Sequence, residues 1–91
     1  MSEKPEAMAK IKVYVTSWCP DCRKALRFLD QHGFAHEEID VDESEEAEEL
    51  VLRVNDGRRK VPTFELDGRY FSCSPYDRER LAEELRNLQK S

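Results

Sequence analysis

Two cysteines separated by two residues, Cys19 and Cys22, are the side chains in this sequence most suited to chemistry. A pair with this spacing either exchanges a disulfide or binds a metal. In the first turn of a helix, residues three apart lie on the same side, within the roughly 4.4 to 6.8 Å Cα separation that a disulfide tolerates. The ring they would close is small, so the bond adds little stability and can open and close readily. We therefore interpret the pair as a redox switch.

The two thiols are predicted to have different roles. Pro20 is suited to the first position of a helix, which places Cys19 at the N-terminus, where free N–H groups and the helix dipole favour a thiolate. Cys19 is therefore the predicted nucleophile. Cys22 follows one turn later on an apolar stripe and is predicted to be the shielded, resolving cysteine. The carboxylate of Asp21 is expected to oppose the thiolate of Cys19 and so to tune its attack rate and reduction potential.

A strand before this pair and a helix after it would position the two sulfurs. From Ile11 to Thr16 apolar and other residues alternate, which predicts a strand with one side buried. After Pro20, apolar residues recur at helical spacing until Gly33, which is expected to end the helix. The predicted buried face of this helix consists of Cys22, Ala25, Leu26 and Leu29.

The remaining elements follow from similar patterns. Ile39 and Val41 predict a second strand, and the acidic run Asp42 to Glu49 predicts the start of a second helix, with Asp42 and Glu45 as a capping box. Asn55-Asp56-Gly57 is expected to end that helix. Its predicted buried stripe is Ala47, Leu50, Val51 and Val54.

A hairpin and a final helix complete the predicted domain. Segments 61–66 and 69–72 flank Asp67-Gly68, a dipeptide that favours a tight turn between antiparallel strands. Ser74, Pro75 and Asp77 are expected to start the last helix, and Leu81, Leu85 and Leu88 to line its inner face. The order βαβαββα predicts an α/β fold with a four-stranded mixed sheet and helices on both faces.

Length and composition limit the classes of function. The 91 residues suffice for one domain, which we place at residues 10–91 after a mobile tail at residues 1–9. The net charge of −5 argues against nucleic acid as a partner, and no apolar stretch is long enough for a membrane span. The first residues lack the apolar core of a signal peptide, so we expect the protein in the reducing cytoplasm. The expected oligomeric state is a monomer.

Three segments together resemble the glutaredoxin family. They are Tyr14-Val15-Thr16-Ser17-Trp18-Cys19-Pro20-Asp21-Cys22, then Val61-Pro62-Thr63-Phe64, then Asp67-Gly68. The resemblance implies a thioredoxin-like fold, disulfide oxidoreductase activity and no tightly bound cofactor, with glutathione as a reductant. It also implies that Pro62 is a cis proline facing Cys19 and that the backbone of Val61 hydrogen-bonds an extended substrate.

The sequence departs from that family at two places that hold glutathione. Thr16 stands where glutaredoxins often have a lysine, and residues 72–77 replace a Gly-Gly pair followed by acids. Arg58 or Arg59 could still meet a carboxylate. Trp18 and Asp21 are more similar to redoxins that receive electrons from thioredoxin reductase. Either glutathione or thioredoxin reductase is therefore an expected electron donor, and disulfide-containing proteins are the expected partners.

The predicted substrate-binding residues surround the cysteine pair. Trp18 is expected to be a substrate contact because rigid aromatic side chains suit partner surfaces. Cys73 could be a third redox centre or a small packing residue. The full predicted set is Trp18, Pro20, Asp21, Arg59, Val61, Pro62, Ser72 and Cys73.

The rival interpretation is a metal-binding protein. Zinc could be held by Cys19, Cys22 and Cys73 together with His32 or His36, and an iron-sulfur cluster could bridge two subunits through the same cysteines. A structural zinc site usually has two paired motifs, however, and this sequence contains only one. The redox interpretation is therefore the main prediction.

Overall fold

A computed structural model describes residues 10–89, with side chains for residues 10–87. Its elements confirm the predicted order βαβαββα and add one short 3-10 helix. They are β1 (Ile11–Val15), α2 (Pro20–Gln31), β2 (His36–Asp40), η1 (Val41–Glu43), α3 (Glu45–Val54), β3 (Thr63–Leu66), β4 (Arg69–Ser72) and α4 (Arg78–Gln89). The tail predicted at residues 1–9 and the inward-facing side chain predicted for Leu88 lie outside the described part.

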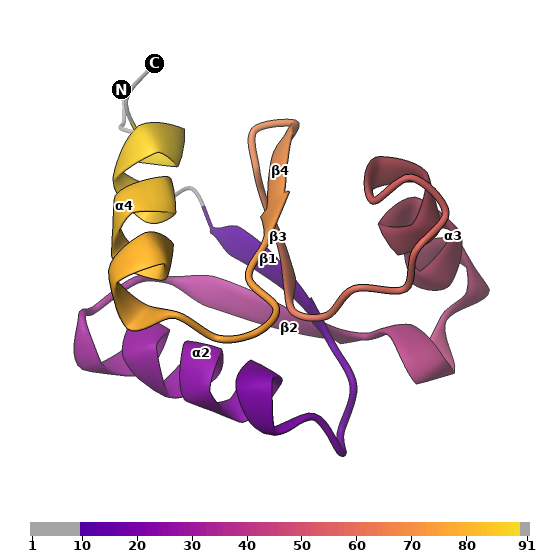
Figure 1. Ribbon diagram of the computed structural model, residues 1–91, viewed down its shortest axis with the longest axis horizontal. Helices are drawn as coiled ribbons and strands as arrows, with labels where there is room; N and C mark the ends of the chain where they lie inside the picture. Colours follow the sequence, from indigo (N-terminus) through magenta and orange to yellow (C-terminus); the bar gives the residue numbers. More distant parts are fainter. Residues whose placement is uncertain (1–9, 90–91) are drawn as a thin grey trace, which may run out of the picture.

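The four strands form one mixed sheet in the order β2-β1-β3-β4. β1 is parallel to β2 and antiparallel to β3, and β3 pairs with β4 as a hairpin. The helices α2 and α4 contact each other on one side of the sheet, while α3 lies on the other (Figure 1). This arrangement confirms the predicted α/β fold with helices on both faces.

β1 is buried on both of its faces, which differs from the predicted strand with one solvated side. Tyr14 is only 6% exposed and Thr16 only 2%, so of residues 11–16 only Lys12 is exposed. The reason is position: β1 lies between β2 and β3, and Tyr14 borders the same hollow as Ala47 and Leu50 of α3. A central strand covered by helices on both sides buries residues of both parities.

Two predicted helix starts are wrong in detail. The cap of α3 is Ser44, whose hydroxyl accepts the N–H of Ala47 at 3.1 Å, and not Asp42. The 3-10 helix η1 inserts an extra turn after β2, so Asp42 lies inside that turn and not at the start of α3. Ser74 was predicted to cap α4.

The cap of α4 is instead Asp77. Its carboxylate accepts the N–H groups of Glu79 at 3.1 Å and Arg80 at 3.2 Å. The sequence predicts Asp77 as the partner of a cap at Ser74, but a short acidic side chain can itself be the cap. The helix therefore begins three residues later than the Ser-x-x-Asp pattern suggested.

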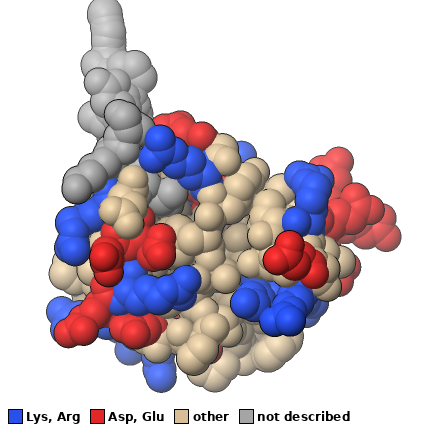
Figure 2. Space-filling view, turned by 45° about the horizontal axis from the view of Figure 1, so that its top comes forward, with Lys and Arg blue, Asp and Glu red and all other residues tan. Residues whose placement is uncertain are grey.

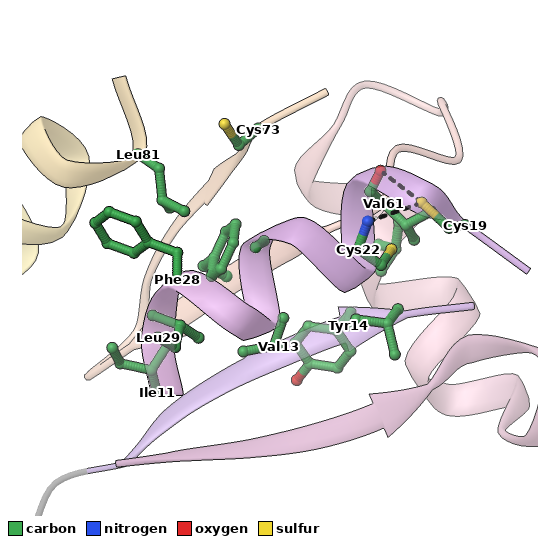
Figure 3. Packing of buried hydrophobic residues seen from close by; sticks show 14 of the residues in the cluster. Ile11, Val13, Tyr14, Cys19, Cys22, Phe28, Leu29, Val61, Cys73 and Leu81 are labelled. Atoms are coloured by element: carbon green, nitrogen blue, oxygen red, sulfur yellow. Dashed lines mark hydrogen bonds between the residues drawn. The ribbon is translucent and has the colours of Figure 1, made fainter. Parts of the chain in front are cut away.

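The core lies mainly between the sheet and the helices α2 and α4. Val13, Phe64, Leu29, Leu81 and Leu85 are completely buried there. Figure 3 shows side chains of α2, β1 and the start of α4 converging on this region. None of the helices within residues 10–89 is long and apolar enough to cross a membrane.

Candidate active site

The sulfur of Cys19 caps the N-terminus of α2. Cys19 has extended backbone angles, Pro20 is the first helical residue, and the Sγ atom accepts the backbone N–H of Cys22 at 3.1 Å. A hydrogen bond from a free N–H at a helix start stabilises negative charge on the accepting atom. The predicted placement of the cysteine pair at the start of a helix is therefore confirmed, and the two thiols lie close together as free cysteines.

Cys22 is shielded as predicted, whereas Cys19 is more enclosed than the sequence led us to expect. Cys22 is 1% exposed and Cys19 only 6%. The carbonyl oxygen of Val61 lies 3.9 Å from the Cys19 sulfur, and Figure 3 shows this contact across the start of α2. Cys19 is thus enclosed by a loop that is remote in sequence.

Burial keeps Cys22 protonated. Desolvation, followed by a hydrogen bond with Cys19, raises the pKa of the Cys22 thiol to about 12, although a backbone hydrogen bond at Thr16 acts in the opposite direction. A thiol with so high a pKa is a weak nucleophile at neutral pH. Cys22 therefore fits the predicted resolving role, in which it reacts only with a disulfide formed beside it.

The raised pKa of Cys22 has a consequence for stability. The folded protein favours the neutral thiol, so this contribution is fully present below the ordinary pKa of 9.0 and is lost as pH rises towards 12. Denaturant unfolding of the reduced protein across this range is expected to show falling stability, and Cys22→Ala should lower the slope. Tyr14, whose pKa is also raised by burial, adds a slope common to both proteins. Equal slopes in the two proteins would contradict the assignment.

The loop before β3 contributes the backbone that faces Cys19. The Val61-Pro62 peptide bond is cis, as the resemblance implied, and Pro62 is buried. The side chain of Thr63 fixes this loop through two hydrogen bonds. Its hydroxyl donates to the carbonyl of Lys60 at 2.6 Å and accepts from the side-chain amide of Asn55 at 3.1 Å.

Sequence reasoning missed this pair of positioning residues. The sequence pattern identifies Asn55 only as part of the segment that ends α3, and Thr63 only as a strand residue. The Asn55 amide also donates to the carbonyl of Val51 at 2.8 Å, so it ties the end of α3 to the start of β3. No local pattern reports such a contact, because it joins two elements that meet only after folding.

Of the other predicted contact residues, three lie around the start of α2. Trp18 is 65% exposed, the most exposed large apolar side chain described. Pro20 is exposed and Asp21 is half-buried in the first turn. A large aromatic side chain that is left in solvent beside a buried nucleophile suits contact with a partner. Their roles in binding remain predictions.

Cys73 packs away from the redox pair. It is completely buried, its N–H donates to the carbonyl of Pro62 at 3.1 Å, and its sulfur lies 3.7 Å from the carbonyl oxygen of Asp77. Figure 3 shows the Cys73 sulfur directed away from Cys19. This geometry favours the packing interpretation. Ser72, at the end of β4, is half-buried and pairs in register with Thr63.

Arg59 forms ion pairs with acidic residues of the same protein. Its guanidinium pairs with Asp42, and its Nε lies 3.3 Å from a carboxylate oxygen of Glu48. These carboxylates raise the pKa of Arg59. Two acids of the run that the sequence predicted to start a helix thus also pair with Arg59. An incoming carboxylate would have to compete with both acids for Arg59.

Removal of this ion pair is expected to have a modest effect. Arg59→Gln should lower the free energy of unfolding by about 0.5 to 1 kcal/mol at low salt and by less at high salt, because the groups are partly exposed. Denaturant melts at the two salt concentrations measure the effect. The same variant tests the predicted substrate contact: a several-fold rise in KM for a glutathione mixed disulfide would show that Arg59 leaves its acids to bind substrate.

The residues suggested as zinc ligands are not brought together. Within residues 10–89 no three side chains of the His, Cys, Asp and Glu types form a group that could hold a metal. The rings of His32 and Phe28 lie with their centroids 4.2 Å apart and are tilted by 32°, and His36 lies 3.6 Å from a carboxylate oxygen of Asp30. Metal analysis of anaerobically purified protein tests the rival interpretation directly, including a cluster shared by two subunits.

Fold and site define a class: a small α/β protein of the thioredoxin-like fold, with a cysteine pair at the start of a helix and a cis-proline loop facing it. A family model described as Glutaredoxin matches residues 11–71. Mycoredoxin 1 of Corynebacterium glutamicum is 43% identical over 75 residues, which cover 82% of this chain and 92% of that protein. The chain therefore belongs to the glutaredoxin family.

Solved structures agree with this assignment. A glutaredoxin from Archaeoglobus fulgidus is 29% identical, with a TM-score of 0.66 and coverage of 92% of this chain and 96% of that one. NrdH-redoxin from Escherichia coli, described as a glutaredoxin-like protein with a thioredoxin-like activity profile, is 27% identical. Its TM-score is also 0.66, with coverage of 81% of this chain and 92% of that one.

Proposed function

We propose that this protein is a dithiol disulfide oxidoreductase in which Cys19 attacks and Cys22 resolves. The thiolate of Cys19 attacks one sulfur of a substrate disulfide and expels the other as a thiolate, which takes up a proton. Cys22 then loses its proton and attacks the Cys19 sulfur, releasing the second substrate thiol and leaving a Cys19–Cys22 disulfide. An external dithiol or two glutathione thiols supply the electrons that restore the reduced pair.

One observation supports this assignment of roles above all others. The Cys19 sulfur accepts a backbone N–H at the start of α2, whereas the Cys22 thiol is buried one turn inside and has a pKa of about 12. The two sulfurs are alike in chemistry but differ in surroundings. Only the first accepts a backbone N–H at the start of a helix, and only the second has a pKa raised by burial.

The proposed substrates are protein disulfides and glutathione mixed disulfides. The exposed Trp18 and the backbone of Val61, next to the nucleophile, suit an extended polypeptide. On the face in Figure 2, basic and acidic side chains are interleaved, which supports the proposal that nucleic acid is not a partner. We further propose that it acts in electron transport and redox homeostasis in the cytoplasm.

The electron donor is either glutathione or thioredoxin reductase, and a paired assay separates them. Turnover of a protein disulfide is measured with glutathione and glutathione reductase, and again with NADPH and thioredoxin reductase. Because Arg59 is paired with its own acids, we propose that the second donor is the faster one. Turnover supported by glutathione alone would reverse this choice. No turnover with either donor would refute the proposed function.

A further inference from the structure

The helices α2 and α4 form a groove that the redox reaction does not use. Two hollows of about 380 and 370 Å³ lie along these helices, and Phe28 and Arg78 line both of them. We call the combined feature the α2–α4 groove. Its apolar part contains Phe28, Phe34 and Tyr76, which are buried or half-buried.

Four cations border this groove, although the protein as a whole is acidic. Lys24 and Arg27 of α2 and Arg78 and Arg86 of α4 are exposed and line it, against a single acid, Glu79. The formal charge of the groove is therefore +3 with His32 neutral, in a chain of net charge −5.

These cations also differ from Arg59 in the ion pairs that the described residues form. Among the described residues, none of the four forms an ion pair, whereas Arg59 is held by Asp42 and Glu48. Unpaired like charges around an apolar hollow repel each other and attract an acidic ligand. In a chain with 20 acidic residues, Glu79 is the one acid among the residues that line this groove.

The groove is joined to the active site by a short segment. The carbonyl of Pro62, in the loop facing Cys19, accepts the N–H of Cys73, and the Cys73 sulfur contacts the carbonyl of Asp77 just before α4. Tyr76, between these two contacts, lines the groove. Along α2, Lys24 lies about 7.5 Å from Cys19, at 1.5 Å per residue. A polypeptide bound at Cys19 could therefore extend into the groove.

We propose that the α2–α4 groove is a docking site for an acidic polypeptide segment, with an apolar side chain against Phe28 and carboxylates on the four cations. The segment belongs to a protein partner that brings its disulfide to Cys19. This inference rests on the proposed function for the identity of the partner, but binding of the segment itself requires no redox step. The four cations favour an acidic segment through charge complementarity and orient it in the groove. Phe28 and Tyr76 supply the apolar contact area.

The test uses a short fluorescein-labelled peptide, rich in glutamate with one central phenylalanine, and the full chain carrying Cys19→Ser so that no exchange occurs. Peptide binding is followed by fluorescence anisotropy and by amide shifts of labelled protein. The groove variant combines Lys24→Gln, Arg27→Gln, Arg78→Gln and Arg86→Gln. The control combines Lys10→Gln, Lys12→Gln, Arg53→Gln and Arg80→Gln, exposed cations outside the groove with the same loss of charge.

We expect the amide shifts to concentrate in α2 and α4, and the groove variant to bind about tenfold more weakly than the control. Equal weakening of both variants would show a long-range charge effect and overturn the proposal, as would equal binding of a lysine-rich peptide. Shifts confined to the surroundings of Trp18 would also overturn it. Turnover of a small disulfide by groove and control variants that retain Cys19 reports separately on the proposed function, and is expected to be unchanged.

Discussion

Cys19→Ser is expected to lower disulfide turnover on the order of a thousandfold or more with either electron donor, because the attacking sulfur is removed and a hydroxyl does not replace it. The fold should be retained, since Cys19 lies at the end of a helix and the serine hydroxyl can accept the same N–H of Cys22. Turnover is measured with both donor systems, and the unfolding midpoint is measured beside it.

Alkylation of the reduced wild-type protein provides the matching control. Under native conditions iodoacetamide should modify Cys19 before Cys22 and Cys73. The Cys19 sulfur accepts a hydrogen bond from the backbone N–H of Cys22 and is less buried than the other two sulfurs. Modification of Cys22 or Cys73 well before Cys19, or unchanged turnover of the serine variant, would show that the nucleophile has been assigned to the wrong residue.

Cys22→Ser is expected to convert the substrate disulfide into a stable mixed disulfide with Cys19. The first attack needs only Cys19, whereas the release of the second thiol needs a neighbouring thiol that the variant lacks. Turnover of a protein disulfide without glutathione should fall about a hundredfold or more, with accumulation of the covalent complex. Non-reducing electrophoresis and intact mass measure that complex.

Cys73→Ala is the matched control for this trapping experiment. Cys73 is as buried as Cys22, but its sulfur contacts the carbonyl of Asp77 and points away from the redox pair. We expect this variant to complete turnover without a trapped complex. If it also accumulates a mixed disulfide, Cys73 is the third redox centre that the sequence left as an alternative.

The sequence alone predicted most of the fold because most of its signals are local. The Asp67-Gly68 turn is one example: Asp67 and Gly68 have φ angles of +53° and +81°, and the dipeptide suits this left-handed pair of conformations. Pro20 marked the first residue of α2 for a similarly local reason. The predicted caps at Asp42 and Ser74 were wrong because a second capping residue, Ser44 or Asp77, follows each of them within three residues.

Burial of β1 could not be predicted in the same way. The alternation from Ile11 to Thr16 is that of a strand with one buried side, yet Tyr14 and Thr16 are buried as well. The burial of Tyr14 depends on α3, which borders the same hollow and begins about thirty residues later in the chain. An alternating pattern shows which side chains of a strand are apolar. It does not show which helices will cover the two faces of that strand.

The amino-acid sequence by itself determined the type and spacing of the reacting groups: two thiols one helical turn apart, with a proline that starts the helix between them. Only the tertiary structure decided how enclosed those thiols are, that Arg59 is occupied by Asp42 and Glu48, and that Cys73 faces Asp77. The physical reason is how far apart in the sequence the interacting residues lie. Helix starts and turns depend on neighbours in the chain, whereas burial and ion pairing depend on residues that meet only when the sheet and its helices have packed.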